Sequence, residues 1–145
     1  MQKVWDKYPK ARLHLYNCND KRSYDTFRTL IDYCKFTNFV RSLQGSVNDV
    51  NILLNRVDIV VSGLYPLFAR TPIEALAAGK ASICMGYNQS EYPWTVKEYS
   101  PDAFADTIID CWENYDKINY RKYAELNHDV LETARQAIQI YEKFL

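Results

Sequence analysis

Short apolar runs alternate along the chain with stretches in which hydrophobic residues recur every three or four positions. Residues 12–16 and 39–43 have the composition of short β-strands, and residues 24–34 carry apolar side chains at the spacing of one helical face. The sequence Ser-Val-Asn-Asp, which begins at Ser46, resembles a helix-capping box with Asp49 in the place where glutamate is more common. The first third of the chain is therefore predicted to form strand, helix, strand and helix.

The second part of the chain continues this alternation. Residues 57–61 are β-branched except for Asp58, which predicts a strand covered on both faces. Thr71 as the N-cap and Pro72 as the first residue predict a helix that ends at Gly79. A buried strand is predicted at residues 81–85, an edge strand at 95–99 and a helix from Ser100 to about residue 112. Residues 119–145 are predicted to be helical, with one apolar stripe.

Strands that are separated by helices of this length indicate βαβ units and right-handed crossovers. We therefore predict an α/β fold, a Rossmann-like open parallel sheet with helices on both faces, which lacks its first strand and closes with a long C-terminal helix. Residues 1–145 are predicted to form a single domain. In such sheets, ligands bind at the carboxyl ends of the strands. The loops at residues 44–48, 62–71 and 86–94 are the places to expect a site.

Composition and charge narrow the classes of function. The 145 residues include 18 Lys and Arg and 18 Asp and Glu, so the zero net charge gives no general electrostatic footprint for nucleic acid. The apolar runs are too short to span a bilayer, and the first residues lack the apolar region of a signal peptide. The four scattered cysteines and two histidines argue against a metal cluster or a disulfide framework. These features predict a cytoplasmic protein with no transmembrane segment and no metal.

The most informative segment for chemistry is residues 62–86, where a strand leads through a loop into a helix. The free N–H groups and positive dipole end of that helix can hold a phosphate without a run of glycines. Glu74, one turn into the helix, has the chemistry to accept hydrogen bonds from two vicinal hydroxyls, as on a ribose. The alternative is that Thr71 and Glu74 form a capping box, which needs no ligand.

The sequence F-A-R-T-P-I-E-A-L-A-A-G-K-A at residues 68–81 resembles the signature of the group 1 family of retaining glycosyltransferases with the GT-B fold. Other segments resemble the family's motifs in the same order along the chain: residues 8–16, 39–49, 55–62, 100–105 and 133–145. The resemblance implies that the chain is the C-terminal, nucleotide-sugar-binding half of such a two-domain enzyme.

The resemblance also implies the site residues. Glu74 matches the second glutamate of the family's E-x7-E motif, which holds the ribose hydroxyls. The loop that contacts the donor sugar and phosphates matches Phe68, Ala69, Arg70 and Thr71, and the loop that borders the nucleobase matches Gly45, Ser46 and Val47. The resemblance assigns no catalytic residue in this chain, no metal and no cofactor apart from the nucleotide diphosphate sugar, which is a substrate.

Two departures from the family pattern change the expectation. Pro66 stands where the family carries its first glutamate, and a proline cannot accept a hydrogen bond from a sugar hydroxyl. The resemblance also implies that the chain begins inside the helix that follows the family's first strand, without the family's acceptor-binding N-terminal domain. Arg70 either pairs with phosphate or lies in solvent. We expect the fragment alone not to catalyse transfer, because catalysis needs groups from both halves.

The predicted function is therefore that of a donor-binding domain. The parent enzyme would transfer a sugar from a nucleotide diphosphate donor to a glycan or lipid-linked acceptor in polysaccharide biosynthesis, with peripheral membrane association at most. The alternatives are a nucleotide-sugar epimerase, or a non-catalytic module that binds a nucleotide or glycan, which the departure at Pro66 favours. Four aromatic residues in the expected ligand-side loops either stack on a base or sugar or pack within the loops: Tyr65, Tyr87, Tyr92 and Trp94.

Overall fold

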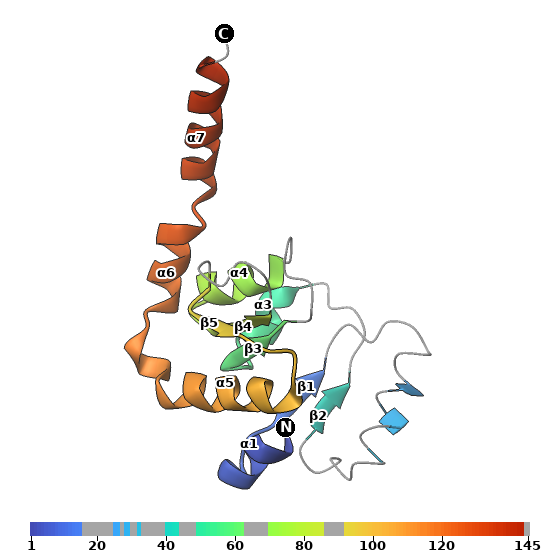
Figure 1. Cartoon of the computed structure of the whole chain (residues 1–145). Coiled ribbons are helices and arrows are strands. Elements are labelled where there is room, and N and C mark those ends of the chain that lie inside the picture. The colour runs from blue at the N-terminus through green and yellow to red at the C-terminus, as the bar shows by residue number, and fades with distance from the viewer. Residues whose placement is uncertain are drawn as a thin grey trace. The chain divides into compact units, whose positions relative to one another are not determined.

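The structure is a computed structural model of the 145 residues (Figure 1). It describes residues 1–15, 25–26, 28–29, 32, 49–62, 70–85 and 92–143, together with the backbone of residues 40–43. The chain divides into two compact units, Met1–Ile52 and Leu53–Leu145, and each is described by itself.

The first unit contains two of the predicted strands. Helix α1 spans Gln2–Lys7, strand β1 spans Leu13–Leu15, and strand β2 spans Val40–Leu43. The two strands pair in parallel, which is the arrangement that a βαβ unit requires. Of the helix predicted between them, residues 25, 26, 28, 29 and 32 are described, and all are helical. An ion pair of 3.2 Å joins Arg28 to Asp32 on one side of this helix.

Helix α3 spans Val50–Leu54 and begins later than the sequence predicts. The Asp49 carboxylate accepts a hydrogen bond from the backbone N–H of Asn51 at 2.9 Å. Asp49 therefore caps the helix itself, and the prediction that it lies inside the first turn is wrong. The physical reason is that a short carboxylate reaches the N–H two residues ahead of it, as N-cap residues do. Ser46 lies outside the described residues.

The second unit is built on a parallel sheet of three strands. Strand β3 spans Ile59–Val61, β4 spans Ala81–Met85, and β5 spans Trp94–Val96, in the order β3-β4-β5. Helix α4, Arg70–Ala77, packs against β3 and β4, and α5, Pro101–Glu113, packs against β4 and β5. Figure 1 shows α4 and α5 on opposite sides of the sheet. The predicted α/β class, with parallel strands between helices, is confirmed.

The strands β3 and β4 differ in how far they are buried. The first four residues of β4 are all buried, so this strand is covered on both faces, as predicted. The same prediction is wrong for β3, because Val61 is 47% exposed and Ile59 and Val60 are only half-buried. The physical reason is position, since β3 is an edge strand of the three-stranded sheet whereas β4 is central.

Helix α4 ends in a turn that joins it directly to β4. The backbone N–H of Gly79 donates to Leu76 O, and that of Lys80 donates to Ala75 O, each at 2.9 Å. Gly79 has φ of +76°, the left-handed conformation that this type of helix end requires and that glycine adopts without steric cost. The helix end predicted at Gly79 is therefore confirmed.

The start of α4 differs from the prediction. The helix begins at Arg70, so Thr71 is its second residue and is not the N-cap. Pro72 still lies in the first turn, where its missing N–H leaves no intrahelical hydrogen bond unmade.

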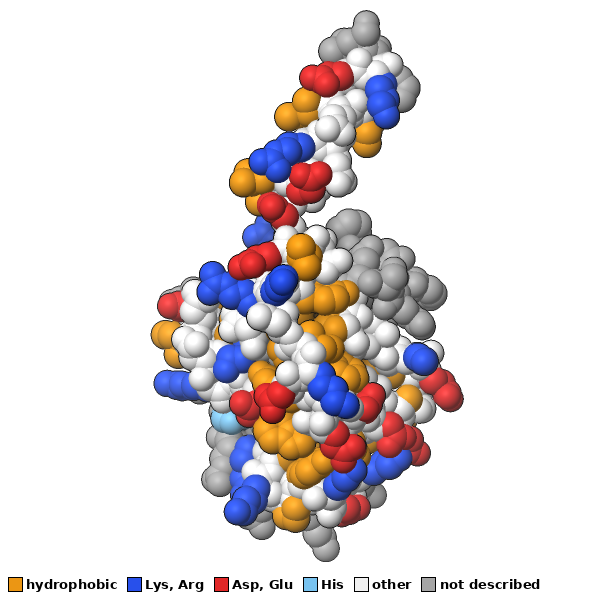
Figure 2. All heavy atoms as spheres, turned by 90° about the vertical axis from the view of Figure 1, so that its left-hand side faces the viewer, with side chains coloured by type: hydrophobic (Ala, Val, Ile, Leu, Met, Phe, Trp, Pro, Cys, Tyr) orange, Lys and Arg blue, Asp and Glu red, His pale blue; other side chains and the backbone are white. Residues whose placement is uncertain are grey.

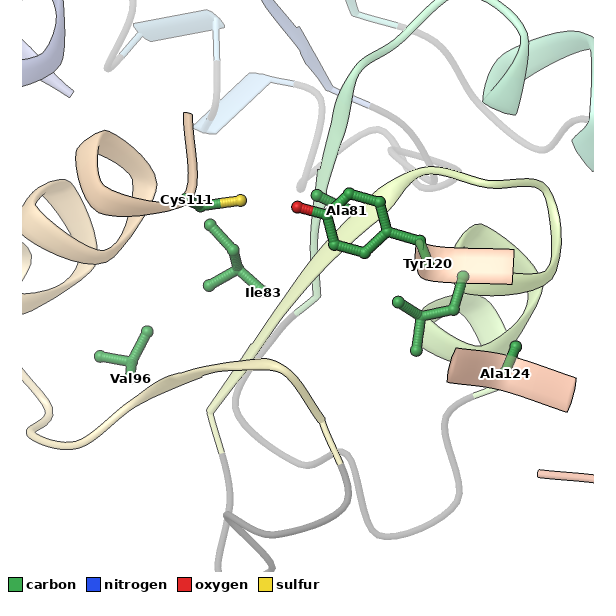
Figure 3. Packing of buried hydrophobic residues seen from close by; sticks show 7 residues of the cluster. Ala81, Ile83, Val96, Cys111, Tyr120 and Ala124 are labelled. Atoms are coloured by element: carbon green, nitrogen blue, oxygen red, sulfur yellow. The ribbon is translucent and has the colours of Figure 1, made fainter. Parts of the chain in front are cut away.

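The core of the second unit lies between the sheet and its helices (Figure 3). Ser100 caps α5 by accepting a hydrogen bond from the Ala103 N–H at 3.1 Å, as predicted. Tyr120 is buried, and its hydroxyl accepts a hydrogen bond from Trp94 Nε1 at 3.2 Å. Figure 3 shows that hydroxyl pointing toward the sulfur of Cys111 on α5. The buried members of the cluster are Leu76, Ala81, Ile83, Val96, Cys111, Tyr120 and Ala124.

The C-terminal part of the chain forms two helices where the sequence predicts one helical stretch. After the 3₁₀-helix Tyr115–Lys117, α6 spans Tyr120–Asn127 and α7 spans Val130–Glu142. Asp129 begins the second helix by accepting a hydrogen bond from the Leu131 N–H at 2.8 Å. The prediction missed this break because the apolar stripe continues across it, although Asp129 followed by Glu132 is a capping-box signal. None of the described helices has the length and apolar composition needed to cross a membrane.

The buried thiol and phenol of the core predict how stability depends on pH. Burial raises the pKa of Cys111 from 9.0 to about 12, and that of Tyr120 from 10.0 to about 12. Above pH 9 the unfolded chain therefore binds fewer protons than the folded chain, so the free energy of unfolding falls as pH rises. We expect this decline to extend to about pH 12, where the folded-state groups also lose their protons.

Urea unfolding on both sides of pH 9 measures this decline, with Cys111→Ala as the comparison. The variant is less stable at every pH because it removes buried atoms, but its stability falls less steeply above pH 9. An equally steep fall in both proteins would contradict the role assigned to the Cys111 thiol.

Candidate functional site

The candidate site lies where β3 leads toward α4. Because β3 and β4 run parallel and α4 lies between them in the sequence, the N-terminal end of α4 belongs to the carboxyl edge of the sheet. Ser62, the first residue after β3, is tied to β4 at this edge. Its N–H donates to Ile83 O at 3.0 Å, and its hydroxyl lies 3.4 Å from the same oxygen. The backbone directly after β3 is therefore fixed to the central strand β4.

The Cys84 thiol lies beside Ser62 but does not have the properties of a nucleophile. The Ser62 hydroxyl donates to Cys84 Sγ at 3.4 Å, and Ser82 Oγ lies 3.7 Å from the same sulfur. Burial raises the pKa of the Cys84 thiol, although both hydroxyls act in the opposite direction. The thiol is consequently protonated at neutral pH, whereas nucleophilic and metal-binding cysteines act as thiolates. Cys84 is thus a buried packing residue.

Helix α4 has one face in the core and one face away from it. Pro72, Ala75 and Leu76 are buried, and they orient the helix against the sheet. Arg70 and Thr71 are exposed at the N-terminal end. A positive dipole end and an exposed guanidinium therefore occur together at the start of α4, and both favour an anion.

Glu74 is half-buried, one turn after Arg70. Its side chain makes no hydrogen bond or ion pair with any described residue. A capping box would require Thr71 before the helix, but Thr71 is inside it. The structure therefore disfavours capping, the competing interpretation of Glu74, and leaves its carboxylate oxygens without a partner among the described residues.

The structure describes three of the eight residues that the sequence assigns to the site. Arg70, Thr71 and Glu74 all lie on α4, within its first five residues. The other five lie outside the described residues, as does the position of the departure at Pro66: Phe68, Ala69, Gly45, Ser46 and Val47. The link from Ser62 to β4 is a feature of this edge that the sequence analysis did not predict. The signal in the sequence is a small hydroxyl residue directly after an apolar strand.

Two of the four candidate aromatic residues pack within the protein. Trp94 is the first residue of β5 and donates to the Tyr120 hydroxyl. Tyr92 stacks on His128 with ring centroids 5.6 Å apart. These contacts agree with the packing interpretation of both residues. Tyr65 and Tyr87 lie outside the described residues.

Within the described part of the chain, no group of three or more His, Cys, Asp or Glu side chains is arranged to hold a metal ion. What this part of the chain offers for chemistry is therefore the N-terminal end of α4, with the Arg70 and Glu74 side chains.

Known proteins resemble this chain in three-dimensional structure, whereas searches by sequence find no match. No protein-family model matches the chain. No curated protein matches it either. Among solved structures, the sucrose-phosphate synthase tll1590 from Thermosynechococcus elongatus is 18% identical over 97% of the chain, with a TM-score of 0.73. A glycosyltransferase from Rickettsia africae ESF-5 is 20% identical over 97% of the chain, with a TM-score of 0.74. Anabaena Alr3699/HepE, solved in complex with UDP-glucose, is 17% identical over 99% of the chain, with a TM-score of 0.70.

The chain spans less than half the length of each of these structures, namely 40%, 42% and 45%. At such identities the likeness shows the fold. The chain has the Rossmann-like α/β fold that occurs in one part of these GT-B glycosyltransferase structures.

Proposed function

We propose that the chain is the donor-binding domain of a retaining glycosyltransferase, which holds a nucleotide diphosphate sugar at the N-terminal end of α4. The observation that carries the proposal is Glu74, a half-buried carboxylate on the edge of the sheet where ligands bind, with no role in capping its helix. The structural likeness to glycosyltransferases, one of them in complex with UDP-glucose, supports this choice of ligand.

The spacing of charges on α4 fits the two polar parts of a nucleoside diphosphate. Arg70 and Glu74 are four residues apart, which is about 6 Å along a helix axis. In the proposed complex, the diphosphate lies at the helix N-terminus, with its charge stabilised by the dipole and by Arg70. Glu74 accepts hydrogen bonds from the two ribose hydroxyls. The roles that the family resemblance implies for Thr71, Phe68 and Ala69 at the diphosphate and sugar, and for residues 45–47 at the base, are part of this proposal.

The chemical role of the domain follows from this arrangement. Transfer breaks the bond between the sugar and the diphosphate, so negative charge grows on the leaving phosphate. The positive end of α4 and Arg70 stabilise that charge without a metal ion. Groups that activate the acceptor belong to another part of the enzyme. We include in the proposal a glycan or lipid-linked acceptor, polysaccharide biosynthesis and a cytoplasmic location.

Glu74→Ala is expected to weaken donor binding by roughly 10- to 100-fold, because it removes charge-assisted hydrogen bonds to the ribose. Isothermal titration calorimetry of the 145-residue chain with UDP-, GDP- and ADP-sugars measures the effect. The control is Glu125→Ala, an exposed glutamate on α6, which is expected to bind as the unchanged chain does. Failure of every donor to bind, or equal binding by Glu74→Ala, would overturn the proposal.

A second candidate is a module that binds a nucleotide sugar without turning it over. The presence of Pro66 in place of the family's sugar-facing glutamate favours it. The two candidates differ in what happens to a bound donor. When donor and protein are incubated with an acceptor and the remaining polypeptide of the enzyme, transfer or hydrolysis identifies the transferase, and intact donor identifies the binding module.

A further inference from the structure

Arg70 and Glu74 on α4 have the spacing of a helical ion pair, but they do not form one. The same order and spacing give an ion pair of 3.2 Å between Arg121 and Glu125 on α6. Figure 2 likewise shows red and blue side chains next to each other along α7. Arg70 is exposed and makes no hydrogen bond or ion pair with any other described residue. Its guanidinium is therefore available to a ligand separately from the Glu74 carboxylate.

The charge next to the expected position of the donor sugar has the opposite sign from that in the family pattern. Arg70 is the only charged residue of the sequence between Asp58 and Glu74. The family's sugar-facing glutamate is replaced by Pro66, which has no carboxylate. A glutamate at that position repels a sugar that carries a negative charge, and such repulsion is a common source of specificity. Without the glutamate and with Arg70, this segment favours an acidic sugar over a neutral one.

The acidic group that suits Arg70 best is a carboxylate. The guanidinium is a planar fork of N–H donors that pairs with both oxygens of a carboxylate at once. A sugar hydroxyl offers a single oxygen, so it matches only part of the fork. Uronic acids carry a carboxylate at C6 in place of the hydroxyl group of a neutral hexose. Since a guanidinium has five N–H donors, those that the carboxylate does not use remain for the diphosphate.

We propose that the sugar of the donor is a uronic acid, whose C6 carboxylate pairs with Arg70. This inference rests on the proposed function, because it names the sugar that the nucleotide carries. In the complex, the N-terminal end of α4 holds the diphosphate, Glu74 holds the ribose, and Arg70 selects the sugar. Because Arg70 is exposed, water and salt screen the pairing in part, so the preference for a uronic acid is moderate.

Isothermal titration calorimetry of the 145-residue chain with donors that differ only at C6 tests this selection. The first set of ligands is UDP, UDP-glucose and UDP-glucuronate, and the second is GDP, GDP-mannose and GDP-mannuronate. For the nucleotide that binds, we expect the uronate donor to bind roughly five- to tenfold tighter than the neutral donor. This ratio is expected to decrease at high salt, because the pairing that produces it is between two charges.

Variants of Arg70 separate the sugar from the nucleotide. Arg70→Gln is expected to lower the ratio to about one and to change the Kd of the nucleoside diphosphate by less than about threefold, because the helix end and Glu74 still hold it. Arg70→Lys keeps the charge without the fork, so it retains only part of the preference. The matched control is Arg56→Gln, which removes an exposed arginine before β3 and is expected to leave the ratio unchanged.

The outcomes distinguish this inference from the proposed function. Equal binding of the neutral and uronate donors would overturn the inference, as would a preference that persists in Arg70→Gln. It would also be overturned if Arg70→Gln weakened the nucleoside diphosphate as much as the uronate donor, since Arg70 would then act on the diphosphate alone. In these cases a nucleotide still binds, so the proposed function stands. If no nucleotide binds, the proposed function is wrong, and the inference is wrong with it.

Discussion

Leu76→Ala is expected to lower the free energy of unfolding by about 2–5 kcal/mol. Leu76 on α4 is completely buried and belongs to the core cluster that joins the sheet to its helices. Removing its outer carbons leaves a cavity that the surrounding backbone of α4 and β4 fills only in part. The loss would be a large fraction of the total stability of an ordinary domain.

The control for this variant is Leu126→Ala. Leu126 is also a helical leucine, but it is 73% exposed on α6, so the same substitution is expected to change stability by less than about 0.5 kcal/mol. Urea unfolding followed by circular dichroism measures both variants. If the two substitutions cost the same, the assignment of Leu76 to the core is wrong.

Tyr120→Ala is expected to cost about 3–5 kcal/mol, because it empties the space of a buried aromatic ring. The ring packs in the cluster between β4 and α5, with Tyr115 at a centroid distance of 5.2 Å. Tyr120→Phe keeps the ring and removes only the hydroxyl that accepts the Trp94 hydrogen bond. We expect the phenylalanine variant to lose about 1 kcal/mol, the usual contribution of one hydrogen bond.

Tyr99→Ala is the matched control for this pair, since Tyr99 is 70% exposed. Thermal and urea unfolding of the three variants should rank them with Tyr120→Ala the least stable, Tyr120→Phe next and Tyr99→Ala close to the unchanged protein. If Tyr120→Phe were as unstable as Tyr120→Ala, the hydrogen bond and not the ring would carry the stabilisation, contrary to our interpretation.

The elements that the sequence predicted well are those with a local physical signal. Strand β4 is an unbroken buried run, and α5 begins with a serine cap and a proline. The end of α4 was predictable because a single glycine supplies the backbone conformation that the turn needs. In each case, neighbouring residues alone determine the structure.

The sequence predictions are wrong where the position of a strand in the sheet sets its burial, and where one of several possible N-cap residues sets the start of a helix. Nothing in the composition of β3 distinguishes an edge strand from a central one, yet Val61 is exposed because of that position. The sequence pattern predicts that Asp49 and Asp129 lie inside helices, whereas each of these aspartates begins a helix. Both errors overlook that aspartate is a strong N-cap, a preference that outweighs the continuity of an apolar pattern.

The location of the candidate site and its residues are predicted from two separate sources. Physical reasoning placed it at the start of α4, and the resemblance to a family selected Glu74 among the acidic residues of the chain. The structure adds two facts that neither the sequence pattern nor the resemblance provides. Glu74 is half-buried, and it forms no capping arrangement with Thr71. The roles of the residues at 45–47 and 68–69 stay predictions.

The turn at Gly79 determines where Glu74 lies. The two hydrogen bonds that end α4, together with the one from Ala81 N–H to Asp58 O at 3.2 Å, fix this helix to the sheet from its C-terminal side. The buried face of α4, which includes Ala75 and Leu76, is therefore held against the sheet from this end of the helix. In the complex that we propose, this anchor would fix Glu74 at the nucleotide while substitutions elsewhere in the site change which sugar is recognised.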